Sequence, residues 1–120
     1  MATFVFQKRS MGSGESRISD ELVVPAGLAA ARVELDMNAA EMRDPTTDVR
    51  GILEFFDAIE AGDWRLIAAT RLTGDPSNSV SDVPSINIGA STLQQLEGKR
   101  IRGRVIALSD GNYGATLSWS

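Results

Sequence analysis

Short apolar runs of strand length, separated by turn residues, fill the chain from Leu22 to Trp119. The clearest run, residues 31–37, alternates apolar and charged side chains at every second position. This period of two is typical of a β-strand with one buried and one solvated face. The chain has 120 residues, enough for one hydrophobic core. We therefore predict an all-β, antiparallel β-sandwich, jelly-roll-like, with about eight strands.

The N-terminal segment differs from the rest of the chain. Residues 3–9 predict a short strand, and the Gly- and Ser-rich residues 10–16 are typical of a flexible linker. That strand is either an edge strand of the sandwich or a detachable arm. We accordingly expect an N-terminal strand or arm with its linker at residues 1–17 and a β-sandwich domain at residues 18–120.

One hairpin is predicted from residues 49–56 and 63–72. With Phe56 opposite Asp63, Phe55 faces Trp64 and Glu54 faces Arg65, so that hydrophobic and charge matches favour the same register.

A second hairpin is predicted at the C-terminus through a three-residue turn, Ser109 to Gly111, with Gly111 left-handed. This turn predicts a buried face with Val105, Leu117 and Trp119. Arg102 and Arg104 are expected on the opposite face.

The residue types argue against catalysis. The chain contains neither histidine nor cysteine, which removes the commonest general base, the thiol nucleophile and the usual zinc ligands. The acidic residues within 57–63 lack the ligand spacing of an EF-hand loop. We predict a non-enzymatic protein with no catalytic residue, no metal and no cofactor.

Charge and hydropathy indicate which surfaces take part in binding. The net charge of −4 argues against a nucleic-acid partner. No apolar run approaches the about 20 residues that span a bilayer, and the N-terminus has no recognisable secretory signal, so we expect a soluble protein with no membrane partner. Arginines at every second position from residue 100, followed by two aliphatic residues, form a stripe of the kind favoured at protein interfaces; the alternative is a solvated sheet face. The predicted interface residues, taken from this stripe and from the N-terminal strand, are Phe4, Val5, Phe6, Arg102, Arg104, Ile106 and Leu108.

The layout of residues 18–119 resembles the small β-sandwich accessory proteins of tailed bacteriophage virions, such as capsid decoration proteins. The features that carry the resemblance are Leu-Val-Val-Pro-Ala-Gly at 22–27, the alternating residues 32–37, Asp-Pro-Thr-Thr at 44–47, the hairpin with Trp64, and Lys-Arg-Ile-Arg at 99–102.

This resemblance implies a non-enzymatic virion structural protein, a capsid decoration or stabilising subunit that binds a coat lattice or neighbouring copies. It implies a coat or other virion protein as partner, a homo-oligomer or repeated assembly, and a location in the virion after synthesis in the host cytoplasm. The alternative is a carbohydrate-binding β-sandwich module. Exposed, coplanar rings of Trp64, Tyr113 and Trp119 would favour sugar binding, whereas the predicted registers bury all three.

Overall fold

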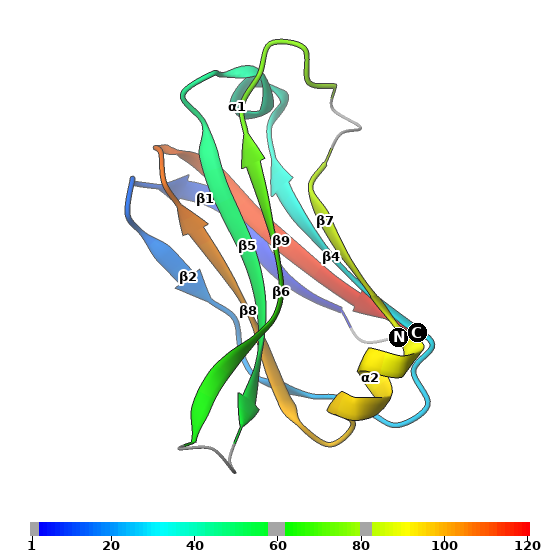
Figure 1. The fold of residues 1–120 in the computed structure, drawn as a ribbon. Helices are drawn as coiled ribbons and strands as arrows, with labels where there is room; N and C mark the ends of the chain where they lie inside the picture. Colours follow the sequence, from blue (N-terminus) through cyan, green and yellow to red (C-terminus); the bar gives the residue numbers. More distant parts are fainter. Residues whose placement is uncertain (1–2, 58–61, 80–82) are drawn as a thin grey trace.

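The structure, a computed structural model, describes residues 3–57, 62–79 and 83–120, with side chains from Phe6 onward. In these ranges nine strands form two antiparallel sheets that pack face to face (Figure 1). Two short helices, α1 and α2, lie at opposite ends of the sandwich. The predicted all-β antiparallel sandwich is therefore confirmed.

The sheets contain four and five strands. The four-stranded sheet has the order β1-β9-β4-β7; the five-stranded sheet has the order β2-β8-β5-β6, with the short β3 also paired to β8. The elements are β1 Thr3–Met11, β2 Ser16–Ile18, β3 Leu22–Val23, β4 Ala30–Met37, α1 Ala39–Arg43, β5 Asp48–Asp57, β6 Asp63–Thr73, β7 Ser85–Gly89, α2 Ala90–Leu96, β8 Arg100–Ala107 and β9 Gly111–Trp119.

The strand order is that of a jelly roll once β3 is set aside, because β1, β9, β4 and β7 form one sheet and β2, β8, β5 and β6 the other. In this topology most successive strands lie in different sheets. Their connections therefore cross from one layer to the other, and only β5 and β6 form a hairpin among the paired strands.

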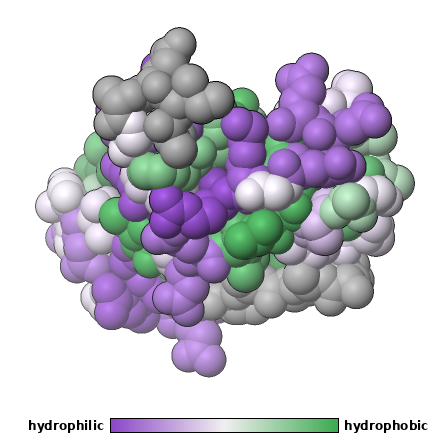
Figure 2. Space-filling view, turned by 90° about the horizontal axis from the view of Figure 1, so that it is seen from below, coloured by the Kyte–Doolittle hydropathy of each residue, from purple (hydrophilic) through white to green (hydrophobic). Residues whose placement is uncertain are grey.

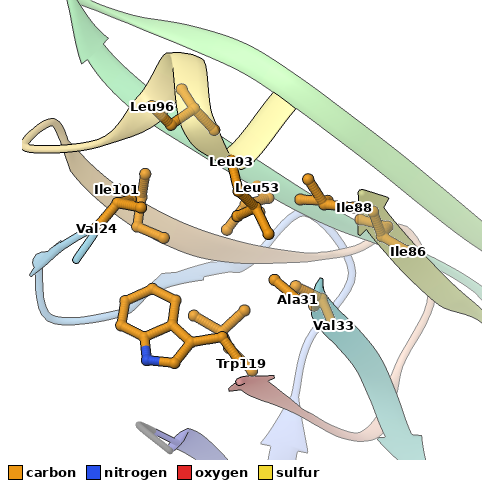
Figure 3. Packing of buried hydrophobic residues seen from close by; sticks show 11 residues of the cluster. Val24, Ala31, Val33, Leu53, Ile86, Ile88, Leu93, Leu96, Ile101 and Trp119 are labelled. Atoms are coloured by element: carbon orange, nitrogen blue, oxygen red, sulfur yellow. The ribbon is translucent and has the colours of Figure 1, made fainter. Parts of the chain in front are cut away.

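The core lies between the sheets. The alternating strand β4 buries Val33 and Leu35, which are 2% and 1% exposed, as its period of two predicts. Figure 3 shows that the core cluster next to α2 takes Leu93 from that helix and Trp119 from the last strand. A short helix thus closes one end of the sandwich with apolar side chains from both its turns.

The predicted C-terminal hairpin is wrong, although its burial pattern is correct. Strands β8 and β9 lie in different sheets, because β8 pairs with β5 while β9 pairs with β1 and β4. Val105 and Leu117 are fully buried and Trp119 is 5% exposed, as expected from the alternation. Gly111 has no left-handed backbone. A Cβ there would lie 2.5 Å from the Tyr113 hydroxyl, so close packing requires the glycine.

The β5–β6 hairpin is confirmed, but its register differs from the prediction. Phe56 lies opposite Trp64, and Glu54 lies opposite Leu66 rather than Arg65. The register shifts between Leu53 and Glu54, where the partner changes from residue 68 to residue 66 and residue 67 becomes the extra residue of a β-bulge. Because a one-residue slip turns every side chain to the other face, Trp64 lies on the outer face of the sheet instead of the core.

The N-terminal strand is an edge strand in this structure. β1 pairs along β9, with Phe6 and Met11 buried at 8% and 1% exposure. Arg17 of β2 donates from Nη1 to the carbonyl oxygens of Gln7 (2.7 Å) and Tyr113 (3.1 Å), so it links the two sheets beside β1. The division of the chain at residue 17 into an arm with its linker and a separate domain stays a prediction.

Candidate interaction surface

Exposed hydrophobic side chains gather on one sheet. The exposed fractions are 50% for Ile18 in β2, 60% for Val23 in β3, 63% for Leu66 in β6 and 42% for Leu108, which directly follows β8. All four belong to the five-stranded sheet or to its end. Where exposure is described, the four-stranded sheet has no exposed large hydrophobic residue.

The outer face of the four-stranded sheet is polar instead. On β4, Arg32 forms an ion pair with Glu34 and donates from Nη1 to Asn87 Oδ1 on β7 over 3.0 Å. Thr116 and Ser118 of β9 lie between these strands and β1. The outer face of the four-stranded sheet is therefore suited to contact with water, whereas the five-stranded sheet carries the exposed hydrophobic residues.

Two arginines of β8 lie over aromatic rings on the outer face of the five-stranded sheet. The guanidinium of Arg102 is 4.0 Å from the ring centroid of Trp64, and that of Arg100 is 4.1 Å from the ring of Phe56. The two rings meet edge to face, with centroids 5.4 Å apart and planes at 62°. Cation–π contact and ring packing hold these long side chains in place.

Glu54 lies at the centre of this face. Its carboxylate accepts a hydrogen bond from Arg102 Nε at 2.9 Å and lies 3.2 Å from Arg104 Nη2, while the residue is only 9% exposed. Arg104 Nε is buried and has no hydrogen-bond partner among the residues that the structure describes. One carboxylate therefore serves two half-buried cations.

The outer face is positively charged, although the protein is acidic overall. Arg71 donates from Nε to Asp48 Oδ1 over 2.8 Å, and this hydrogen bond lowers the pKa of Asp48. Arg100 pairs with Glu21 at 2.8 Å, and Arg50 forms no ion pair with any residue that the structure describes. Five arginines thus face three carboxylates: Arg50, Arg71, Arg100, Arg102 and Arg104 against Glu21, Asp48 and Glu54.

We name this surface the arginine-rich face: the outer side of β2, β3, β8, β5 and β6. Of the residues predicted for an interface, Arg102, Arg104 and Ile106 lie on it, half-buried, and Leu108 lies at its end. Phe6 belongs to the other sheet and is buried in the core beneath Arg17. The side chains of Phe4 and Val5 lie outside the described part of the chain.

Several members of this face were not predicted from the sequence. Ile18 and Val23 lie there because β2 and β3 pair with Arg104 and Arg100 of β8, a pairing that no local pattern predicts. Trp64 lies there because of the β-bulge. Glu54 and Phe56 are two residues apart on β5 and therefore lie on the same face of the sheet. This spacing was the one signal in the sequence that could have placed them on the outer face.

The structure provides no sugar-binding platform from the three candidate aromatic residues. Tyr113 is fully buried, Trp119 is 5% exposed, and the ring of Trp64 is covered by Arg102. Among the described residues there is also no group of three side chains able to hold a metal ion. None of the helices there is long and apolar enough to span a membrane. Residues 58–61 of the predicted acidic loop lie outside the described ranges.

Comparison with known proteins gives a fold but no family. No family model matches the chain, and no curated protein matches its sequence. The structure is similar to the crystal structure of the Yersinia pseudotuberculosis-derived mitogen, with a TM-score of 0.59 and 7% identity over 98% of this chain and 85% of that one. It is also similar to PirA, with a TM-score of 0.51 and 7% identity over 98% of this chain and 93% of that one. At this identity the likeness shows the fold alone.

These matches overturn the resemblance to phage decoration proteins. The β-sandwich is shared over nearly the whole chain with a bacterial mitogen and with PirA, and it gives no link to a virion. The predicted function as a virion structural protein is wrong, because it rested on strand spacing that many jelly rolls share. The expected coat-protein partner, repeated assembly and virion location stay predictions.

Proposed function

We propose that this chain is a non-enzymatic binding protein that engages an acidic protein surface through the arginine-rich face. The observation that carries this proposal is the contrast between the two outer faces of one sandwich. One face is polar and internally paired, whereas the other combines exposed aliphatic residues with excess positive charge.

The apolar part of the face supports docking of a macromolecule. Ile18 and Val23 are half-exposed or more, and burying them fully contributes about 1 kcal/mol each, roughly half the value of a complete side chain. They lie on neighbouring short strands at the edge of the sheet, so that one partner segment contacts both. Two such contacts alone give weak affinity and need the charged groups beside them.

The charged part of the face sets the kind of partner. Arg50 is exposed and without an ion pair among the described residues, and the side chains of Arg71 and Arg100 stay about half exposed in their ion pairs. Partner carboxylates therefore gain charge-assisted hydrogen bonds and faster association. Arg102 and Arg104 are already held by Glu54, which reduces the side-chain entropy lost on binding.

A protein partner fits this face better than a sugar. Sugar rings stack on open aromatic faces, but the guanidinium groups of Arg100 and Arg102 occupy the rings available here. One structural neighbour is named as a mitogen, for an effect on cells rather than for a reaction. This name agrees with a fold used for binding.

The test is selection of peptides from a random library displayed on yeast. We expect the wild-type protein to enrich peptides that combine Asp or Glu with aliphatic residues. Their binding should weaken as ionic strength rises, because partly exposed ion pairs are screened.

Matched variants then locate the binding surface. Arg50→Gln and the pair Ile18→Ser with Val23→Ser should each weaken the selected peptides at least about threefold. Arg32→Gln removes an exposed arginine from the opposite sheet and should leave binding unchanged. Circular dichroism checks that each variant remains folded. Selection of peptides without acidic residues, or equal weakening by Arg32→Gln, would refute the proposal.

A further inference from the structure

A depression of about 500 Å³ lies at the α2 end of the sandwich, apart from the centre of the arginine-rich face. It is bounded by the C-terminal end of β5, the N-terminal part of β6 and α2. Figure 2 views the molecule from this end and shows hydrophobic surface beside hydrophilic groups. The lining residues are Phe55, Asp57, Leu66, Ile67, Thr92, Gln95, Leu96 and Lys99.

The apolar half of the lining comes from both sides of the depression. Phe55 and Ile67 are half-buried and pack against the core, while Leu96 of α2 is 6% exposed. Leu66, 63% exposed, stands at the β-bulge where the depression meets the edge of the sheet. A ligand with an apolar body would cover Leu66 and the exposed parts of the other three side chains.

The polar half contains one uncompensated charge. Lys99 Nζ lies 5.6 Å from the ring centroid of Phe55 and forms no ion pair with any described residue. The carboxylate of Asp57 is offset by Arg65, whose Nε lies 3.0 Å away. Thr92 and Gln95 are neutral groups that both donate and accept hydrogen bonds. The depression therefore favours one negative charge beside Lys99.

We propose that this depression binds a ligand with a single carboxylate on an aliphatic body. Lys99 holds the carboxylate, and Phe55, Leu66 and Ile67 cover the aliphatic part. A free medium-chain carboxylate and the C-terminal residue of a peptide share this chemistry. The volume of the depression lies within the range of about 300 to 1,000 Å³ that is usual for small-molecule sites.

The test is a titration with octanoate followed by NMR chemical shifts. We expect saturable shifts at the lining residues, with acetate and 1-octanol binding at least about threefold more weakly because each lacks one half of the ligand. A peptide with a C-terminal leucine, compared with its C-terminal amide, distinguishes the sources. Tighter binding of the peptide acid than of octanoate identifies a peptide C-terminus, and the reverse identifies a free carboxylate.

The chain offers a matched control, because Lys8 and Lys99 are its two lysines. Lys99→Gln should weaken octanoate at least about threefold, while Lys8→Gln, in β1 of the other sheet, should leave it unchanged. Leu66→Asn, at an exposed position, should also weaken it. Absence of saturable octanoate binding, or equal affinity in wild type and Lys99→Gln, would overturn the proposal. None of the residues varied to test the arginine-rich face, Arg50, Ile18 and Val23, lines the depression, so either proposal can fail alone.

Discussion

The shared carboxylate of Glu54 should stabilise the fold far more than an exposed ion pair does. In Glu54→Gln the side chain keeps its shape but loses the charge that faces Arg102 and Arg104. Those side chains are only 17% and 28% exposed, so water replaces the lost counter-charge incompletely. We expect a clear loss of stability.

The magnitude follows from where this cluster lies between two known limits. Breaking a fully buried pair costs about 3–5 kcal/mol, and breaking an exposed one costs about 0–1 kcal/mol. The exposed fractions of the two arginines lie between these limits but closer to burial, which gives about 2 kcal/mol. For a chain of this size that corresponds to a fall in Tm of roughly 6–10 °C.

The assay is urea unfolding followed by tryptophan fluorescence, with Glu21→Gln as control. Glu21 and Arg100 form a pair of similar length, 2.8 Å, but both side chains are nearly half exposed at 45% and 47%. The control should lose less than about 1 kcal/mol. Equal losses in the two variants, or an unchanged stability in Glu54→Gln, would refute the reasoning from burial.

Three further predictions concern the fold. Gly74→Ala should cost more than about 2 kcal/mol, because its Cβ would lie 1.6 Å from a backbone carbonyl oxygen; Gly89→Ala has no atom within 4 Å and should change the free energy of unfolding by less than about 0.5 kcal/mol. Gly114→Ala should loosen β1, since its Cβ would lie 2.3 Å from a carbonyl oxygen of that strand; faster amide hydrogen exchange across residues 3–11 is the measurement. Asp48→Asn should lower stability at pH 7. The pKa of Asp48 is lower in the folded protein than its unfolded value of about 3.9, so the ionised carboxylate stabilises the fold above that pH and this contribution is lost as the pH falls. In urea unfolding, the difference in stability between Asp48→Asn and wild type should therefore be smaller at pH 3 than at pH 7.

The alternation of side chains was enough to predict most strands and their burial. Val33 and Leu35 are buried as their spacing requires, and Val105 and Leu117 are buried even though the hairpin predicted for them does not exist. The predicted alternation of buried and exposed residues stays correct despite the wrong hairpin, because it depends only on which face of the strand is turned to the core. The same strand buries the same side chains whichever neighbour it pairs with.

The arginine-rich face was only partly predictable. The arginines of β8 share a face by spacing alone, so the common outer face of Arg102 and Arg104 was predicted, while their role in binding stays a prediction. Ile18 and Val23 were missed because short strands carry too few residues to show a period, and Phe6 was assigned to an interface because apolar alternation does not distinguish a core edge from a free arm. The depression beside α2 combines residues from β5, β6 and the helix, which no single segment of sequence brings together.

The sequence by itself determined a β-sandwich of alternating strands, a protein without histidine or cysteine chemistry, and a basic stripe on one strand. Only the tertiary structure decided which sheet each strand joins, where the bulge shifts the register, and that Glu54 meets arginines 48 and 50 residues away. The physical reason is the distance along the chain over which each feature is determined. Alternation is fixed by the geometry of one extended strand, whereas pairing and register are fixed by the packing of both sheets at once, because many pairings of the same strands satisfy the local pattern equally well.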